Sequence, residues 1–214
     1  MINDIAKLQH PRFARMYLRL SEQSERRGGS GHREKMLIGL TGTVIEIGAG
    51  NGLNFSHYPP TVTKVVAVEP GDLLRGYAEG AASAARAPVT VVPGHADRLP
   101  APDGSYDAAV TSLVLCSVPD QSHALAEAAR VVRPGGQLRF YEHVRSDNAL
   151  FSRLEDVVAP AWARFGGGCH PNRETTAAIE QAGFVIDEIE RFSFRFSPLL
   201  PPIAHVVGRA HKTA

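Results

Sequence analysis

Residues 44–52 read Val-Ile-Glu-Ile-Gly-Ala-Gly-Asn-Gly, and no other segment of the chain says as much about its architecture. The run 43–47 is short, apolar and rich in β-branched residues, which is typical of a buried parallel strand. Three glycines follow at alternate positions, and the absence of a Cβ lets the chain turn sharply and bring bare backbone against a ligand. The pattern indicates a nucleotide-like molecule lying over this turn.

The overall composition is that of an ordinary globular protein. Of 214 residues, 43% are hydrophobic and 21% are charged, and the formal net charge is +1. No long run of one charge sign occurs, so nucleic acid is not expected as the main partner. Two cysteines, Cys116 and Cys169, are too few for a disulfide scaffold and suit a reducing cytosol.

The N-terminus and the apolar runs indicate where the protein works. The first residues, Met-Ile-Asn-Asp-Ile-Ala-Lys, lack the basic and then apolar layout of a signal peptide. No run approaches the roughly 18 consecutive apolar residues of a membrane span. We therefore expect a cytoplasmic protein without a membrane span, whereas the oligomeric state is not indicated.

Strand and helix patterns alternate along the chain. This alternation predicts an α/β fold with a doubly wound, mostly parallel, seven-stranded sheet of the Rossmann-like type. Residues 1–40 are expected to form a helical cap or lid, and residues 41–214 the main part of what is one structural domain overall. Strands are predicted over 43–47, 64–69, 89–92, 106–111, 137–142, 184–189 and 206–210. Helices are predicted after Pro11 and over 72–86, 121–132, 149–165 and 172–182, with a break at Gly28–Gly31.

The predicted N-terminal helix carries an apolar stripe. Phe13, Met16, Tyr17 and Leu20 recur at helical spacing, with arginines between them. Packing against the domain core is the first interpretation, and a lid over the ligand is the second. A membrane-surface helix is the least favoured, because the segment is short and lacks Trp.

Ligands of such sheets lie outside the carboxyl ends of the strands. Glu69 ends the second strand, 21 residues after Gly48, where an acid can take two ribose hydroxyls. Residues 94–100 follow the third strand and can flank a flat base. A dinucleotide fingerprint would need a glycine at the position of Leu53, so an oxidoreductase is disfavoured.

Four segments in order resemble the motifs of class I S-adenosylmethionine-dependent methyltransferases: VIEIGAGNG, VVAVEP, GHADRLPAPDGSYDAAV and EAARVVRPGGQLRFYEHV, within residues 43–144. The resemblance implies S-adenosylmethionine as cofactor and S-adenosylhomocysteine as product. The 46–52 loop would hold the methionine end, Glu69 the ribose, and residues 94–96 the adenine. Family members often have Asp where this chain has His95, so the residue that usually meets the adenine amino group differs. The implied donor site comprises Glu46, Gly48, Ala49, Gly50, Asn51, Gly52, Asn54, Glu69, Pro70, Gly94, His95, Ala96, Ser112 and Leu113.

A narrower resemblance extends almost to the C-terminus. The segments TSLVLCSV (111–118), YEHV (141–144), GGC (167–169), RETT (173–176) and PPIAHVVGRAHK (201–212) are similar to the methyltransferase-like 7 group. Members of that group methylate alkyl thiols, which implies S-methylation of a small-molecule thiol here. Animal members carry a hydrophobic N-terminal membrane anchor, and the first residues of this chain do not resemble one.

The chemistry of methyl transfer agrees with a thiol acceptor. The donor methyl is already activated by its sulfonium, so holding a nucleophile in line with the methyl–sulfur bond supplies much of the rate. A thiol with a pKa of about 8.5 is partly ionised at neutral pH, whereas an alcohol needs a stronger base.

Two residues are the candidates for catalysis. His143 directly follows the fifth strand, where its imidazole can take a proton or orient the acceptor; the alternative is a histidine bonded to backbone. Glu142 points the opposite way if the strand continues. Tyr17 can close over the donor from the N-terminal helix, although core packing is an equal interpretation.

The acceptor pocket is expected to be apolar. Its predicted residues are Cys116, Trp162, Cys169 and His170. Cys169 and His170, together with His143, raise the question of a metal, but an adjacent pair lacks ligand spacing and no metal is expected. The alternatives to a thiol S-methyltransferase are a small-molecule O-, N- or C-methyltransferase and a non-catalytic S-adenosylmethionine-binding module.

Overall fold

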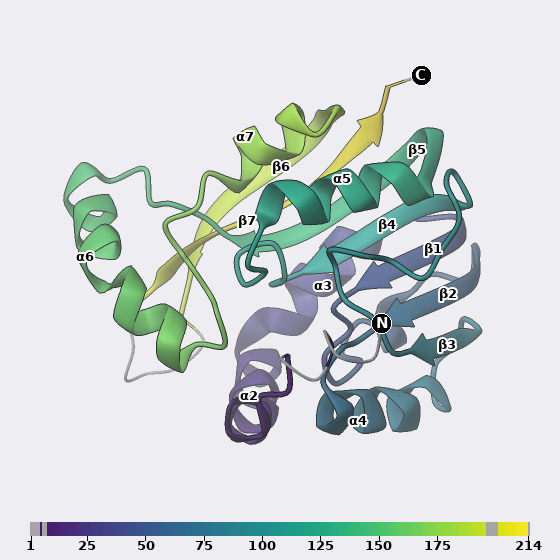
Figure 1. The fold of residues 1–214 in the computed structure, drawn as a ribbon, viewed down its shortest axis with the longest axis horizontal. Coiled ribbons are helices and arrows are strands. Elements are labelled where there is room, and N and C mark those ends of the chain that lie inside the picture. The colour runs from purple at the N-terminus through teal and green to yellow at the C-terminus, as the bar shows by residue number, and fades with distance from the viewer. Residues whose placement is uncertain (1–4, 6–7, 196–200, 214) are drawn as a thin grey trace.

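The computed structural model describes residues 5, 8–195 and 201–213, and these contain one seven-stranded sheet in the order β3-β2-β1-β4-β5-β7-β6 (Figure 1). Neighbouring strands pair in parallel except β7, which runs antiparallel to β5 and β6. The doubly wound, mostly parallel sheet is confirmed. The strands are β1 (Gly42–Ile47), β2 (Val62–Val68), β3 (Val89–Val92), β4 (Tyr106–Ser112), β5 (Val132–His143), β6 (Phe184–Phe194) and β7 (Ile203–Lys212).

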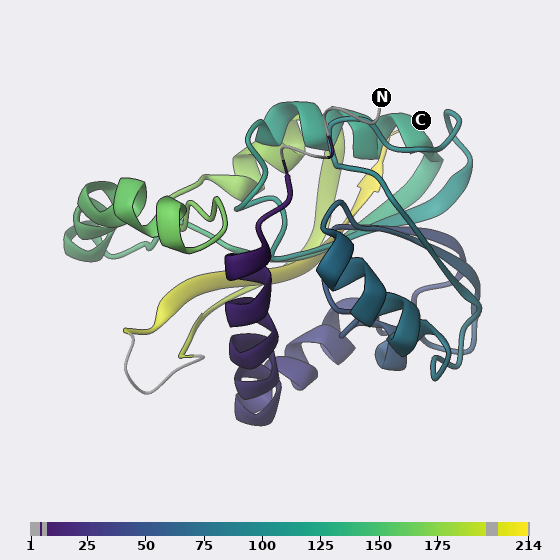
Figure 2. The same ribbon diagram turned by 60° about the horizontal axis from the view of Figure 1, so that its bottom comes forward.

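Helices cover both faces of the sheet, as Figure 2 shows. One apolar core lies under α5 and α7 and contains Leu125 and Ile179. A second core lies under α3 and α4 and contains Leu37 and Ala78. The helices are α2 (Pro11–Ser24), α3 (Ser30–Leu37), α4 (Asp72–Ala82), α5 (Gln121–Val131), α6 (Ala149–Phe165) and α7 (Thr175–Gln181), with a short 3₁₀ turn at Phe55–His57.

The expected break at Gly28–Gly31 is a kink between two helices. A π-helical turn over Glu25–Gly29 joins α2 to α3, and Gly28 redirects the chain with a φ of +114°. Only glycine reaches such a φ without strain, so the helical run turns there without ending. Residues 1–40 as a separate cap remain a prediction.

The apolar stripe of α2 faces a cavity. Phe13, Met16, Tyr17 and Leu20 all line it, whereas the buried residues of α2 are Ala14 and Ser21. The expectation that the stripe packs into the core was therefore wrong, because the space opposite it is open. Within the described part of the chain, no helix has the length and apolar character that crossing a bilayer requires.

Candidate active site

The glycine turn after β1 is packed so closely that side chains do not fit. Gly48, Gly50 and Gly52 have φ values of +69°, +58° and +81°. A Cβ on Gly48 would lie 2.5 Å from a methyl of Val114, and one on Gly50 would lie 3.3 Å from the hydroxyl of Tyr17. The turn therefore presents its backbone, and α2 lies directly against it.

Glu69 ties this turn to the end of β2. One carboxylate oxygen accepts a hydrogen bond from the Gly50 amide at 2.8 Å, and the other accepts from the Gly71 amide at 2.8 Å. The side chain is buried; burial raises its pKa, and the two amides act against this rise. Each oxygen keeps a free lone pair, so ribose hydroxyls can still be accommodated.

Glu46 supports the same loop from inside the protein. Its carboxylate accepts hydrogen bonds from the Asn54 amide at 2.9 Å and the Tyr58 hydroxyl at 2.7 Å. Burial raises the pKa of Glu46 to about 7, although both hydrogen bonds lower it. Arg33 of α3 completes the network by donating to Asn54 and Ser112, each at 2.8 Å. Arg33 was not identified from the sequence, since it lies 79 residues from Ser112.

Two buried acceptor atoms in the donor loops fit a missing ligand. Asn51 Oδ1, after β1, and Asp97 Oδ1, after β3, have no hydrogen-bond partner among the described residues. Buried polar atoms are normally paired, so donors from a bound molecule would complete them. His95 Nδ1 lies 3.8 Å from the other oxygen of Asp97, and Ala96 between them is buried. Asp97 thus supplies a carboxylate to this loop, in which His95 stands where family members often have Asp.

The remaining predicted donor residues also lie at the carboxyl ends of the parallel strands. The Ala49 amide donates to the Val68 carbonyl at 3.0 Å, and Gly94 packs where a Cβ would meet Val68 at 2.8 Å. The Pro70 carbonyl accepts a hydrogen bond from the side chain of Gln9 at 2.8 Å. Leu113 adopts a φ of +60°, which is strained for a side chain of its size. The sheet therefore assembles the predicted donor residues at one edge, and their contacts with the donor remain a prediction.

A cavity of about 270 Å³ opens beside the glycine turn, between α2 and the ends of β4 and β5. Tyr17, Leu113, His143, Trp162 and Cys169 line it. Its wall is mainly apolar, in agreement with the pocket expected from the sequence. Aromatic residues that the sequence did not place there, Phe13 and Tyr141, also line it.

Two of the predicted pocket residues are placed differently. His170 does not line this cavity: its ring nitrogen bonds the Gly168 carbonyl at 2.7 Å. Cys116 is fully buried behind the wall, next to His143. The hydrogen bond of His170 stabilises the loop that carries it, and the structure does not support a contact between His170 and the substrate.

Cys116, His143 and Cys169 form one compact cluster. His143 Nδ1 lies 3.4 Å from Cys116 Sγ and 3.2 Å from Cys169 Sγ, and the two sulfurs are 3.8 Å apart. The Cys116 thiol lowers the pKa of Cys169 most, burial opposes this, and His143 lowers it further. Burial alone would lower the pKa of His143, but Cys169 and Glu142 together outweigh burial and raise that pKa. The sequence suggests His170 as the third member of this cluster, whereas in the structure the third member is Cys116.

Glu142 is turned away from the cavity, as expected from strand alternation. Its carboxylate accepts hydrogen bonds from the amides of Val114 at 3.1 Å and Cys116 at 3.2 Å. The side chain is fully buried and fixes the loop after β4. His143, the next residue, consequently faces the cavity.

Similarity to known proteins identifies the family of this chain. A methyltransferase domain model matches residues 45–140. The human thiol S-methyltransferase TMT1B is 35% identical over 207 residues, covering 90% of this chain and 83% of that protein. The chain belongs to this methyltransferase family. Human TMT1A is also 35% identical, over 79% of this chain and 70% of that protein.

Solved methyltransferase structures share the fold. A Bacillus halodurans protein superposes with a TM-score of 0.73 at 17% identity, over 86% of this chain and 99% of that one. A Thermotoga maritima protein described as a SAM-dependent methyltransferase reaches 0.70 at 24% identity, over 94% and 97% of the two chains. The chain is a methyltransferase enzyme whose cofactor is S-adenosylmethionine.

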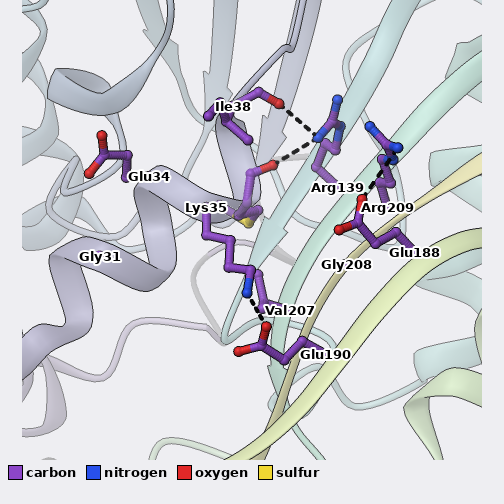
Figure 3. Close-up of a pocket in the computed structure, with 11 residues that line it drawn as sticks. Gly31, Glu34, Lys35, Ile38, Arg139, Glu188, Glu190, Val207, Gly208 and Arg209 are labelled. Carbon is purple, nitrogen blue, oxygen red and sulfur yellow. Dashed lines mark hydrogen bonds and ion pairs between the residues drawn. The ribbon is translucent and has the colours of Figure 1, made fainter.

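A second cavity of this methyltransferase, between α3 and strands β5 to β7, is lined by several charged side chains (Figure 3). Lys35 pairs with Glu190, and Arg209 pairs with Glu188 at 3.3 Å. Arg139 donates to the carbonyls of Met36 and Ile38. These charged groups already have partners, and no residue of the glycine turn lines this cavity, so the first cavity is the better candidate for the acceptor site.

Proposed function

We propose that this methyltransferase transfers the methyl group of S-adenosylmethionine to the sulfur of a small-molecule thiol. The observation that carries the proposal is the apolar cavity between the glycine turn and His143. Its volume, about 270 Å³, fits a small acceptor. The similarity to TMT1B over most of both chains supports sulfur as the attacking atom.

The residues of the donor side can be given roles in this proposal. Glu69 would hold the ribose through its free lone pairs, and Asp97 and Asn51 would accept hydrogen bonds that they lack in the protein alone. Tyr17 would close over the methionine end, because its hydroxyl lies against Gly50. The acceptor would enter from the side of His143 and Trp162.

The reaction depends more on the alignment of the acceptor sulfur with the methyl group than on a strong catalytic base. The acceptor sulfur attacks the methyl carbon as the bond from that carbon to the donor sulfur breaks, which leaves S-adenosylhomocysteine and a thioether. The thiol proton is lost before or during the attack. An apolar cavity favours this reaction, because its walls remove water from the sulfur and from the sulfonium once donor and acceptor are bound.

We also propose that the protein works in a reducing compartment, the cytosol. Cys116 and Cys169 are free thiols with sulfurs 3.8 Å apart, Cys169 in the wall of the cavity and Cys116 behind it. An oxidising compartment favours joining such a pair, and the cytosol keeps it reduced.

Methyl transfer from labelled donor to matched pairs of compounds tests the proposal. Each pair shares one carbon skeleton and differs in a thiol or a hydroxyl group. We expect label on the thiols and little on the hydroxyls, with Glu69→Ala as the control that weakens donor binding by about 2 kcal/mol. Labelling of hydroxyls alone would contradict thiol specificity, and donor binding without transfer to any compound would indicate a binding module.

A further inference from the structure

The cluster of Cys116, His143 and Cys169 has the dimensions of a metal site. Its two sulfurs are 3.8 Å apart, and the imidazole nitrogen is 3.4 Å and 3.2 Å from them. Around a tetrahedral zinc ion, with Zn–S of about 2.3 Å and Zn–N of about 2.0–2.1 Å, sulfurs stand about 3.8 Å apart and nitrogen about 3.6 Å from sulfur. The distances between the three atoms are therefore already close to those between the ligands of a zinc ion.

We propose that these three side chains bind one Zn²⁺ ion and leave its fourth position open to the acceptor cavity. Two thiolates and one imidazole are ligands that zinc prefers over calcium, magnesium or manganese. His143 and Cys169 line the cavity, whereas Cys116 lies behind them. An ion held by this set would face the cavity, which is the arrangement of zinc sites with three protein ligands and one exchangeable ligand.

The backbone around the cluster holds the ligands in place without the ion. The His170 amide donates to the Cys116 carbonyl at 2.7 Å, which joins the loop of Cys169 to the loop after β4. Glu142 holds the Cys116 amide from the other side. A Cβ on Gly168 would lie 2.7 Å from the Ser117 carbonyl, so the two loops meet too closely for a side chain there. Such rigid support is what a preformed site requires.

The ion would serve the thiol reaction, and this part rests on the proposed function. The acceptor thiol would bind at the fourth position as its thiolate, with its proton released to solvent, because a bound cation favours the deprotonated form. A lone pair on that sulfur would then attack the methyl carbon. The product is a neutral thioether, which binds zinc more weakly than a thiolate and can leave.

Metal content tests the site directly. The full chain, purified with its thiols reduced, would be equilibrated with Zn²⁺, freed of excess and assayed for zinc by mass spectrometry. We expect one zinc per chain, and Co²⁺ in its place should give sulfur-to-cobalt charge-transfer absorption. Cys169→Ser and Cys116→Ser should each weaken zinc binding more than roughly 100-fold, because changes outside the ligand shell already cost about 10–100-fold.

Two controls separate loss of a ligand from loss of the fold. His170→Gln changes a neighbouring imidazole that bonds the Gly168 carbonyl, and it should keep its zinc. Donor binding by calorimetry should persist in the serine variants. The site is refuted if the reduced, folded protein takes up no zinc, if the serine variants retain it, or if a Cys116–Cys169 disulfide forms in its place.

A chelation experiment separates the metal proposal from the function. Removal of zinc should lower thiol methylation at least tenfold while donor affinity stays unchanged, and added Zn²⁺ should restore it. Thiol methylation that is indifferent to chelation would refute the zinc-bound thiolate and leave the proposed function standing. Zinc binding at this cluster without methylation of any thiol would uphold the metal site and refute the function.

Discussion

Glu46 gives the protein a pH-dependent stability. Its carboxyl is 1% exposed, and burial raises its pKa from an ordinary 4.5 to about 7. A carboxyl whose pKa is raised by folding is held more tightly as the neutral acid in the folded state. Its contribution to stability is therefore largest below pH 4.5 and is lost as the pH rises to about 7.

Glu46→Gln should remove this dependence, because the amide can donate to Tyr58 and accept from Asn54 as the neutral acid does. Relative to the variant, the wild type should lose about 3 kcal/mol of unfolding free energy between pH 4.5 and 7. Urea unfolding at a series of pH values, without donor, measures the difference. Parallel pH profiles for the two proteins would mean that folding does not raise the pKa of Glu46.

At the scale of elements, α2 and the loop after α6 meet closely at Phe13 and Gly167. A Cβ on Gly167 would lie 2.5 Å from two ring atoms of Phe13, and Gly167 has a φ of +63°. This contact joins the helix that covers the glycine turn to the loop that carries Cys169. Changes in either element should therefore reach the acceptor cavity.

Gly167→Ala tests this contact, and Gly183→Ala is its matched control. Gly183 has a φ of +89° but nothing within 4 Å of a Cβ, so its variant carries the backbone strain alone, about 1–2 kcal/mol. Gly167→Ala should lose about 1–3 kcal/mol more through overpacking against Phe13. It should also raise the KM for the acceptor, whereas Gly183→Ala should not. Equal stability and equal KM in the two variants would show that the Phe13 ring moves aside without a free-energy cost.

For the whole molecule, features set by neighbouring residues could be predicted and features set by the fold could not. The strand at 43–47, the glycine turn and Glu69 follow from local pattern, and all lie where expected. The meeting of Cys116 with Cys169 was missed, because 53 residues separate them and each alone resembles a small buried hydrophobe. Arg33 was missed for the same reason, since its partners come from other parts of the chain.

Donor binding should couple the glycine turn to α2. Asn51 donates to Ser21 at 3.3 Å, and Tyr17 lies against Gly50, so α2 shares the surface on which the donor would lie. A ligand that binds only the folded state at 100 times its Kd adds about 2.7 kcal/mol of stability. We expect most of this to reach the elements that contact the donor.

Hydrogen exchange followed by mass spectrometry measures this coupling. On addition of S-adenosylhomocysteine, amides in residues 11–24 and 48–54 should exchange more slowly, because both segments contact the site. Amides of residues 184–188, in the first half of the edge strand β6, should exchange as before and serve as the internal control. Protection of 48–54 alone would show that α2 takes no share in donor binding. Protection of both segments would mean that the apolar stripe of α2 closes the site.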